Sequence, residues 1–343
     1  MKKLLELEPS VCTASFNYVN CFEKPVGMIL GNNNANDRTY FYLFLKMLQC
    51  YKFDCFDEES TFYSVSYNEI MQYIIGDMLN QEMKTEHVSA IDLHKTVKKN
   101  IDKDRFAMVP INLKVYPDSE YYEEYDWRHV LLITGYDEEE KLYYVCDNGH
   151  EEGNDGSQYT SHSLSFDFVQ ELYISAVQCL GVETVWSMSC HREEPDYTDK
   201  ELFNNVLDLY LYNREKQAYL ELDYLEQIDK EIHSDKPIKV LYEGEEILKS
   251  IDFTFLRTLR YKELFFECLV KTCKELGVES EDVQKVERLG KEIIALWTEM
   301  SNSLLINYHA KKEFDLTDQI VMVTSREKKL YKEISKINTK LNS

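Results

Sequence analysis

The stretch from Trp127 to Asn148, WRHVLLITGYDEEEKLYYVCDN, constrains the fold most because it predicts a β-hairpin. His129 to Tyr136 is apolar and rich in β-branched residues, and Lys141 to Cys146 is aromatic and β-branched. The four residues from Asp137 to Glu140 form a polar loop of hairpin length between them. The chain is therefore expected to contain an antiparallel sheet built around this hairpin.

The open end of the hairpin brings a histidine close to a carboxylate. If Tyr136 pairs with Lys141, counting outward places His129 beside Asp147 and Asn148. The strict count puts Asn148 opposite His129, and a shift of one residue exchanges the faces of Asp147 and Asn148. We favour Asp147, because a carboxylate can fix one ring nitrogen of His129 and leave the other to act on a nucleophile. A hairpin whose end is merely polar is the alternative interpretation.

Cys21 is the strongest candidate nucleophile among nine cysteines. It begins the segment CFEKPVGMIL, where Pro25 is compatible with a first helical turn, so a helix is expected to start near Asn20 or Cys21. The helix dipole and unpaired backbone N–H groups would stabilise a thiolate there, and the N–H of Cys21 could stabilise an oxyanion. Asn17 and Asn20 are alternative side-chain donors. Cys12 is the second candidate nucleophile, but it lies in an extended stretch.

The order of these residues is itself informative. Cys21 precedes His129 by 108 residues, and Asp147 follows His129 by 18. A cysteine on a helix followed by a sheet that carries histidine and then aspartate is the order of papain-like folds. The imidazole would convert the thiol into a nucleophilic thiolate. Five other histidines are weaker candidates for the base because none begins a clear core strand: His87, His94, His150, His162 and His191.

Composition narrows the functional class. The formal net charge of −23 argues against a nucleic-acid partner and suits a cationic one. The cysteines form no CxxC pair, so we expect no metal site and no bound cofactor. No apolar run reaches membrane-spanning length, so no membrane partner is expected. The odd number of cysteines and the absence of a signal peptide predict a cytoplasmic location.

The residues around the hairpin predict an α+β domain over 1–195 and an all-helical domain over 196–343. The acidic, tyrosine-rich tract Pro117–Asp126 leads directly into the His129 strand and is expected to overhang the site, although a solvated loop is the plain alternative. Apolar residues at helical spacing predict four helices in the C-terminal half. Their expected ranges are Lys200–His233, Gly244–Leu276, Ser280–Lys311 and Leu316–Asn342.

The motifs NCFEKPVGMIL, VPINLKVY and RHVLLITGYD…YYVCDN, with the helical C-terminal half, resemble the butirosin-type acyltransferases, papain-like proteins of natural-product biosynthesis. The resemblance is spread over most of the chain. Its sharpest part, the hairpin, is shared with other papain-like families. The sequence departs from the usual papain-like start, because Glu23, Lys24 and Pro25 closely follow the cysteine.

The resemblance implies a catalytic triad of Cys21, His129 and Asp147. It implies transfer of an acyl group from a phosphopantetheine thioester on an acyl or peptidyl carrier protein to a small amine or diamine, without ATP. A cysteine peptidase or thioesterase would use the same residues with water as the acceptor. A non-catalytic papain-like binding module is the third hypothesis, which a Cys21 distant from His129 would favour.

Overall fold

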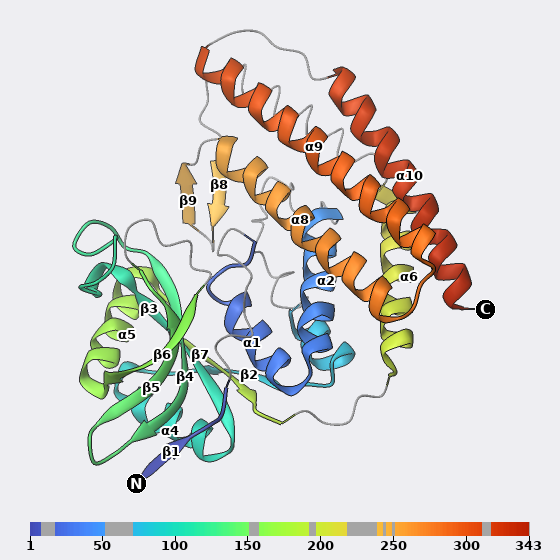
Figure 1. The fold of residues 1–343 in the computed structure, drawn as a ribbon. Coiled ribbons are helices and arrows are strands. Elements are labelled where there is room, and N and C mark those ends of the chain that lie inside the picture. Colours follow the sequence, from blue (N-terminus) through green and yellow to red (C-terminus); the bar gives the residue numbers. More distant parts are fainter. Residues whose placement is uncertain are drawn as a thin grey trace. The chain divides into compact units, whose positions relative to one another are not determined.

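The computed structural model describes residues 1–7, 18–51, 71–150, 158–191, 197–217, 239–242, 245–248, 251–310 and 317–342. It is an α+β structure with N-terminal helices, an antiparallel sheet and a helical C-terminal region, which confirms the expected fold class at that level (Figure 1). Cys12, Asn17 and part of the helix expected over Lys200–His233 lie outside the described residues. No helix in the described ranges is both long and apolar enough to cross a membrane.

Residue contacts group the chain into two units. The first unit comprises Met1–Phe41 and Ile75–Pro195, and the second comprises Tyr42–Ile74 and Asp196–Ser343. One junction therefore lies between Pro195 and Asp196, where the sequence predicts a domain boundary. The segment Tyr42–Ile74 belongs with the C-terminal residues, although it lies in the N-terminal half of the sequence.

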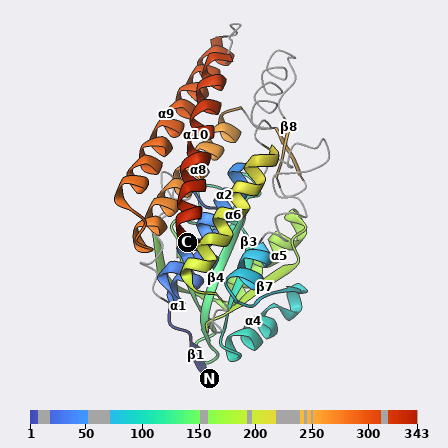
Figure 2. The ribbon, with the colours of Figure 1, turned by 90° about the vertical axis from the view of Figure 1, so that its right-hand side faces the viewer.

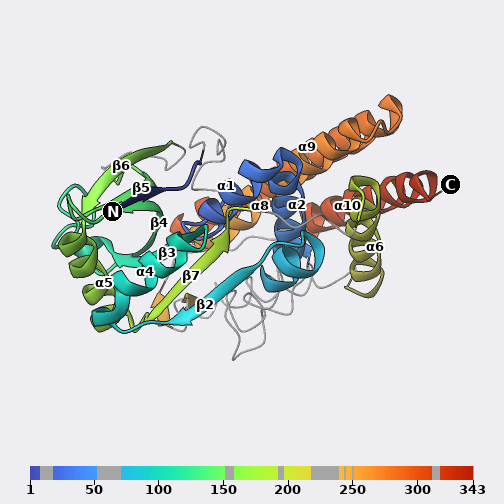
Figure 3. The same ribbon diagram turned by 90° about the horizontal axis from the view of Figure 1, so that it is seen from below.

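The sheet of the first unit runs in the order β2-β7-β3-β4-β5-β6, and β1 pairs with one end of β4. All of these pairs are antiparallel. Helices α4 and α5 pack on it, as Figures 1 and 3 show. The strands are β1 Lys2–Leu4, β2 Met83–His87, β3 Arg105–Asn112, β4 Arg128–Asp137, β5 Leu142–Asn148, β6 Tyr159–Ser165 and β7 Thr184–Ser189.

The predicted hairpin is present as β4 and β5, but its predicted register is wrong. Tyr136 pairs with Tyr143 rather than with Lys141, so the loop begins one residue later than expected. The reason is local: Asp137 stays in the strand, and its Oδ1 accepts hydrogen bonds from the backbone N–H groups of Glu139 and Glu140 at 3.0 and 3.3 Å. This arrangement caps the turn in the manner of an Asx turn.

A β-bulge near Thr134 then shifts the register of β4 against β5. Before the bulge Gly135 pairs with Tyr144, and beyond it Leu132 pairs with Cys146. Because opposite residues of an antiparallel pair share a face, this register places Asp147 on the same face as His129. Continued without the bulge, the register from the turn would have given that face to Asn148.

The first unit also contains helices and short helical turns. Only Asn34 separates the first two helices. Residues 159–165 form β6, and the helix that follows it runs from Phe166 to Leu180. The helical elements are α1 Glu23–Asn33, α2 Ala35–Tyr51, which continues into the second unit, η3 Tyr73–Met78, η4 Ala90–Asp92, α4 Leu93–Asp102, η5 Leu113–Val115 and α5 Phe166–Leu180.

The second unit is mainly helical. Helices α8, α9 and α10 run alongside one another, as Figure 2 shows, and α6 packs on α10. A two-stranded sheet occupies residues 239–248 in part, so the helix expected from Gly244 begins only at Ile251. The elements are α6 Asp199–Gln217, β8 Lys239–Tyr242, β9 Glu245–Leu248, α8 Ile251–Glu275, α9 Ser280–Ala310 and α10 Thr317–Leu341.

Candidate active site

Cys21 lies in the first turn leading into α1, close to the helix start expected from the sequence. The carbonyl of Asn20 accepts a hydrogen bond from the backbone N–H of Lys24 at 3.1 Å, so the chain already turns helically at Asn20. The side-chain Oδ1 of Asn20 accepts from the N–H groups of Phe22 and Glu23 at 2.9 and 2.8 Å. The Glu23 carboxylate accepts from the N–H of Asn20 at 3.1 Å, which completes a capping box around Cys21.

The two charged residues that follow Cys21 closely in the sequence, Glu23 and Lys24, are buried. Glu23 and Lys24 have exposed fractions of 0% and 1%. The Lys24 ammonium lies 5.2 Å from the ring centroid of Tyr159, a cation–π contact. Glu23 thus caps the turn and Lys24 packs on β6.

The Cys21 thiol reaches the beginning of β4. Its Sγ lies 4.0 Å from the carbonyl oxygen of Arg128, the residue immediately before His129. The thiol is partly exposed, whereas Cys50 and Cys146 of the N-terminal half are buried. Cys21 therefore lies beside the backbone that carries His129, while direct transfer of a proton between thiol and imidazole stays a prediction.

His129 and Asp147 meet in a direct hydrogen bond. The Nε2 atom of His129 lies 2.7 Å from Oδ1 of Asp147, and the exposed fractions of the two residues are 3% and 1%. His129 stands at the start of β4 and Asp147 near the end of β5, so the hairpin and its bulge fix both residues. With Nε2 donating to the carboxylate, Nδ1 is the nitrogen that can accept a proton.

A second histidine bonds to the same carboxylate. His150 Nε2 lies 2.9 Å from Oδ2 of Asp147, and the rings of His129 and His150 meet edge to face with centroids 4.5 Å apart. The sequence supports His150 only as a weaker candidate for the base, because it lies in a polar stretch after β5. Its spacing of three residues from Asp147 was the available clue.

Electrostatics keep the carboxylate ionised and the imidazole neutral. Burial alone would raise the pKa of Asp147, but attraction to His129 and His150 and their hydrogen bonds lower it well below its usual value. Burial lowers the pKa of His129; attraction to Asp147 opposes this, and repulsion from His150 and Lys24 adds to it. A neutral His129 that donates from Nε2 is the form in which Nδ1 acts as a base.

The same three side chains are the group in the described residues whose donor atoms could surround a metal ion, since these atoms lie within 4.8 Å of one another. Ligands of a tetrahedral zinc ion, bound at about 2.0–2.2 Å, would stand about 3.3–3.5 Å apart. The observed contacts of 2.7 and 2.9 Å are imidazole–carboxylate hydrogen bonds. We therefore interpret the cluster as a hydrogen-bonded group of side chains.

An acidic loop is attached directly to this cluster. The carbonyl of His150 accepts a hydrogen bond from the backbone N–H of Glu120 at 2.9 Å, and Tyr116 packs edge-on against the His150 ring, with centroids 5.2 Å apart. Asn112 closes the other end of the loop, because its Oδ1 accepts from the N–H of Trp127 at 3.0 Å. Five acidic residues of the loop are exposed: Asp118, Glu120, Glu123, Glu124 and Asp126.

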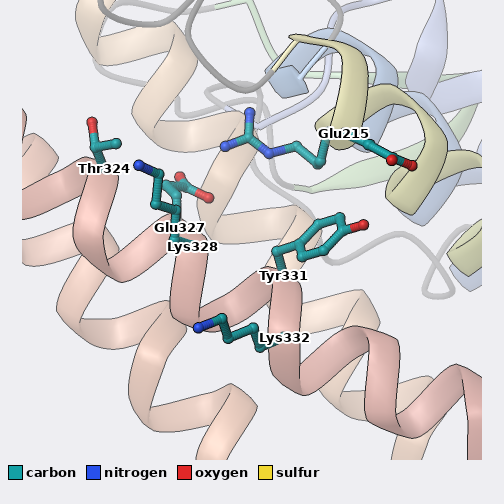
Figure 4. A pocket seen from close by; sticks show the side chains of 7 residues that line it. Glu215, Thr324, Glu327, Lys328, Tyr331 and Lys332 are labelled. Carbon is teal, nitrogen blue, oxygen red and sulfur yellow. The ribbon is translucent and has the colours of Figure 1, made fainter.

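A separate cavity of about 260 Å³ lies between α6 and α10 in the second unit. Figure 4 shows Thr324, Glu327 and Lys328 together on one stretch of α10, with Tyr331 and Lys332 further along. Glu327 is buried and bonds through Oε1 to the buried Lys262 of α8 at 3.0 Å. Within the described part of the chain, its other oxygen has no hydrogen-bond partner. The cavity contains no residue of the predicted triad.

The geometry thus joins His129 to Asp147, brings Cys21 to the backbone beside His129, and adds His150, which the sequence did not single out. A comparison of the chain with protein-family models and with curated proteins finds no match.

Proposed function

We propose that this chain is an ATP-independent acyltransferase of papain-like fold, with Cys21 as nucleophile, His129 as base and Asp147 as the residue that orients the base. The observation that carries the proposal is the buried 2.7 Å bond between His129 and Asp147, at the end of β4 that the Cys21 thiol also approaches. The capped turn around Cys21 supports it, because backbone N–H groups at a helix start stabilise a thiolate.

In the first half-reaction His129 takes the thiol proton and the Cys21 thiolate attacks the carbonyl carbon of a carrier-bound thioester. The new carbon–sulfur bond to Cys21 forms as the bond to the phosphopantetheine sulfur breaks. That sulfur leaves as a thiol with the proton from His129. One thioester replaces another, so this step needs no ATP.

In the second half-reaction an uncharged amine attacks the acyl-enzyme. The carbon–nitrogen bond forms, the bond to the Cys21 sulfur breaks, and the amine proton passes through His129 Nδ1 back to Cys21. The Asp147 carboxylate keeps the required tautomer and stabilises the imidazolium. An amide is more stable than a thioester, so the transfer runs downhill.

The acidic loop favours a cationic acceptor such as a diamine. One amino group must be deprotonated to react, while the other can stay protonated and contact Glu120, Glu123 or Glu124. The backbone bond between Glu120 and His150 ties this loop to the cluster that contains Asp147. A water molecule as acceptor would make the enzyme a thioesterase or peptidase, and the loop provides no comparable reason for that choice.

The test is to incubate the full chain with N-acetylcysteamine thioesters, acetyl, hexanoyl and benzoyl, and to measure the intact mass without and with 1,4-diaminobutane. We expect one acyl adduct on Cys21 without the amine and its discharge as amide when the amine is added. Cys21→Ala should abolish the adduct. Cys190→Ala is the matched control, because Cys190 is also partly exposed but burial and Asp104 raise its pKa.

The outcomes separate the hypotheses. An adduct that persists in Cys21→Ala would move the nucleophile elsewhere, with Cys12 examined next. An adduct that only water discharges, across mono- and diamines, would replace the transferase with a thioesterase or peptidase. Replacement of Glu120, Glu123 and Glu124 by Gln should raise KM for 1,4-diaminobutane more than for butylamine, because only the diamine retains a charge for the loop.

A further inference from the structure

His150 shares the Asp147 carboxylate equally with the predicted base. Its Nε2 lies 2.9 Å from Oδ2, while His129 Nε2 lies 2.7 Å from Oδ1. All three side chains are buried, with His150 the most exposed at 9%. Both carboxylate oxygens therefore have an imidazole partner, and neither can exchange that partner for bulk water.

This arrangement has a steric consequence. A carboxylate held through one oxygen can still rotate about its Cβ–Cγ bond, whereas one held through both oxygens by two buried rings cannot. The His150 ring is itself held by Tyr116, and its backbone carbonyl by Glu120. Because Tyr116 and Glu120 hold His150 in place, His150 in turn restrains the Asp147 carboxylate, whose Oδ1 atom accepts the N–H of His129.

The sharing of Asp147 between two imidazoles also has an electrostatic consequence for His129. Each hydrogen bond to Asp147 draws on the same negative charge, so His150 weakens the attraction that Asp147 can offer to a proton on His129. The other charged group acting on His129 is Lys24 from α1, which acts in the same direction. Strand β3 contributes only the apolar Ile111 opposite His129.

We propose that His150 is a positioning residue, which fixes the Asp147 carboxylate toward His129 and limits the proton affinity of that histidine. The inference rests on the proposed function in one respect, namely that His129 is the base for the Cys21 thiol. Its first test does not require acyl transfer, so failure of the two proposals can be told apart.

The first test measures the titration of His129 by NMR of the full chain labelled with 13Cε1-histidine, in a Cys21→Ala background that removes the thiol. His129→Gln assigns the resonance. His150→Phe keeps a ring against Tyr116 but cannot donate to Asp147, and it should move the titration midpoint of His129 to higher pH. His150→Gln offers an amide N–H at the position of Nε2 and should restore the midpoint toward that of the chain with His150.

The second test measures acyl transfer with Cys21 present. His150→Phe should lower kcat about 10- to 100-fold with little change in KM, the usual loss when a buried group that orients a functional side chain is removed. His150→Gln should stay within about threefold of the natural chain, because the donor is retained.

Either of two results would overturn the proposal. One is an unchanged midpoint and an unchanged kcat in His150→Phe. The other is an equal loss of kcat in the Phe and Gln variants with no change of midpoint, which would mean that His150 acts through packing alone. A shift of the midpoint without any Cys21 adduct in the natural chain would retain the role of His150 at Asp147 and reject the transferase.

Discussion

The buried ion pair between Lys262 and Glu327 makes a strong prediction about the helical unit. The two charged atoms lie 3.0 Å apart, and the exposed fractions of the side chains are 0% and 1%. Glu327→Gln keeps the shape of the side chain but leaves the Lys262 ammonium without a counter-charge. Removing one partner of such a buried pair costs about 3–5 kcal/mol, whereas replacing both by apolar groups is about neutral.

We therefore expect Glu327→Gln and Lys262→Met each to lower the free energy of unfolding by about 3–5 kcal/mol. The double variant Lys262→Met/Glu327→Leu should recover most of that loss. We expect a large coupling because both charged side chains are buried and Lys262 also lies 5.3 Å from the ring centroid of Trp297. The matched control is the exposed pair Lys291–Glu287, 2.8 Å apart, whose disruption should leave the midpoint of unfolding almost unchanged.

Urea unfolding followed by the fluorescence of Trp297 is the assay, with Trp127 and Trp186 replaced by Phe so that the signal comes from the second unit alone. Urea is preferred to guanidinium because it does not screen charges. The slope of the free energy with urea should be equal in all variants. Additive losses in the double variant would refute the argument, because they would mean that the two charges do not compensate each other.

Three further predictions concern the first unit. Asp147→Asn should slow both half-reactions by up to about 10⁴-fold in stopped-flow assays, the loss seen in trypsin, because one amide cannot accept from both imidazoles and one of them must change tautomer; an unchanged rate would reject the orienting role. Gly135→Ala should lower the melting temperature by an amount equivalent to about 1–3 kcal/mol, because the added Cβ would collide with the backbone of Lys3 and Leu4, while Gly76→Ala, with nothing within 4 Å of its Cβ, should not. The free energy of unfolding should fall as the pH drops below 6.5, because burial lowers the pKa of His129 and the unfolded chain then binds a proton that the folded chain does not. The lowered pKa of Asp147 adds a further loss of stability below pH 3.8. Urea midpoints measured from pH 8 to 4 should depend less steeply on pH in His129→Phe than in the natural chain.

The hairpin of β4 and β5 shows which features of the fold the local sequence predicts and which it does not. The β-branched and aromatic residues predicted both strands, because this pattern repeats along each of them. The strict count placed Asn148 opposite His129, and Asp147 was preferred only because of its charge. The register could not be derived in the same way. It depends on Asp137 capping its own turn and on the bulge near Gly135, where the backbone of β1 approaches too closely for a side chain. The approach of Lys3 and Leu4 to Gly135 joins residues more than 100 positions apart in sequence, so no local pattern reveals it.

The sequence predicted no strand at β6 and supported His150 only as a weaker candidate for the base, for a related reason. Residues 159–165, YTSHSLS, are polar because β6 is the last strand of the sheet and several of its side chains are exposed. Only pairing with β5 identifies them as a strand. His150 similarly looked like a loop residue, and its role became visible only when the position of both Asp147 oxygens was known.

The division of α2 between the two units bears on any attempt to study the N-terminal part of the chain by itself. The helix runs from Ala35 to Tyr51, and its residues from Tyr42 onward group with the C-terminal helices. Lys46 is fully buried, bonds to Gln49 at 2.8 Å, and lies 4.0 Å from the ring centroid of Tyr261 on α8. A fragment cut at residue 195 would keep this half of α2 but lose α8. The fragment would keep the buried apolar residues Leu43, Phe44, Leu45 and Met47 without the helix that contacts Lys46. Loss of activity in such a truncated protein would report aggregation or misfolding, and would say nothing about which half of the sequence carries the chemistry.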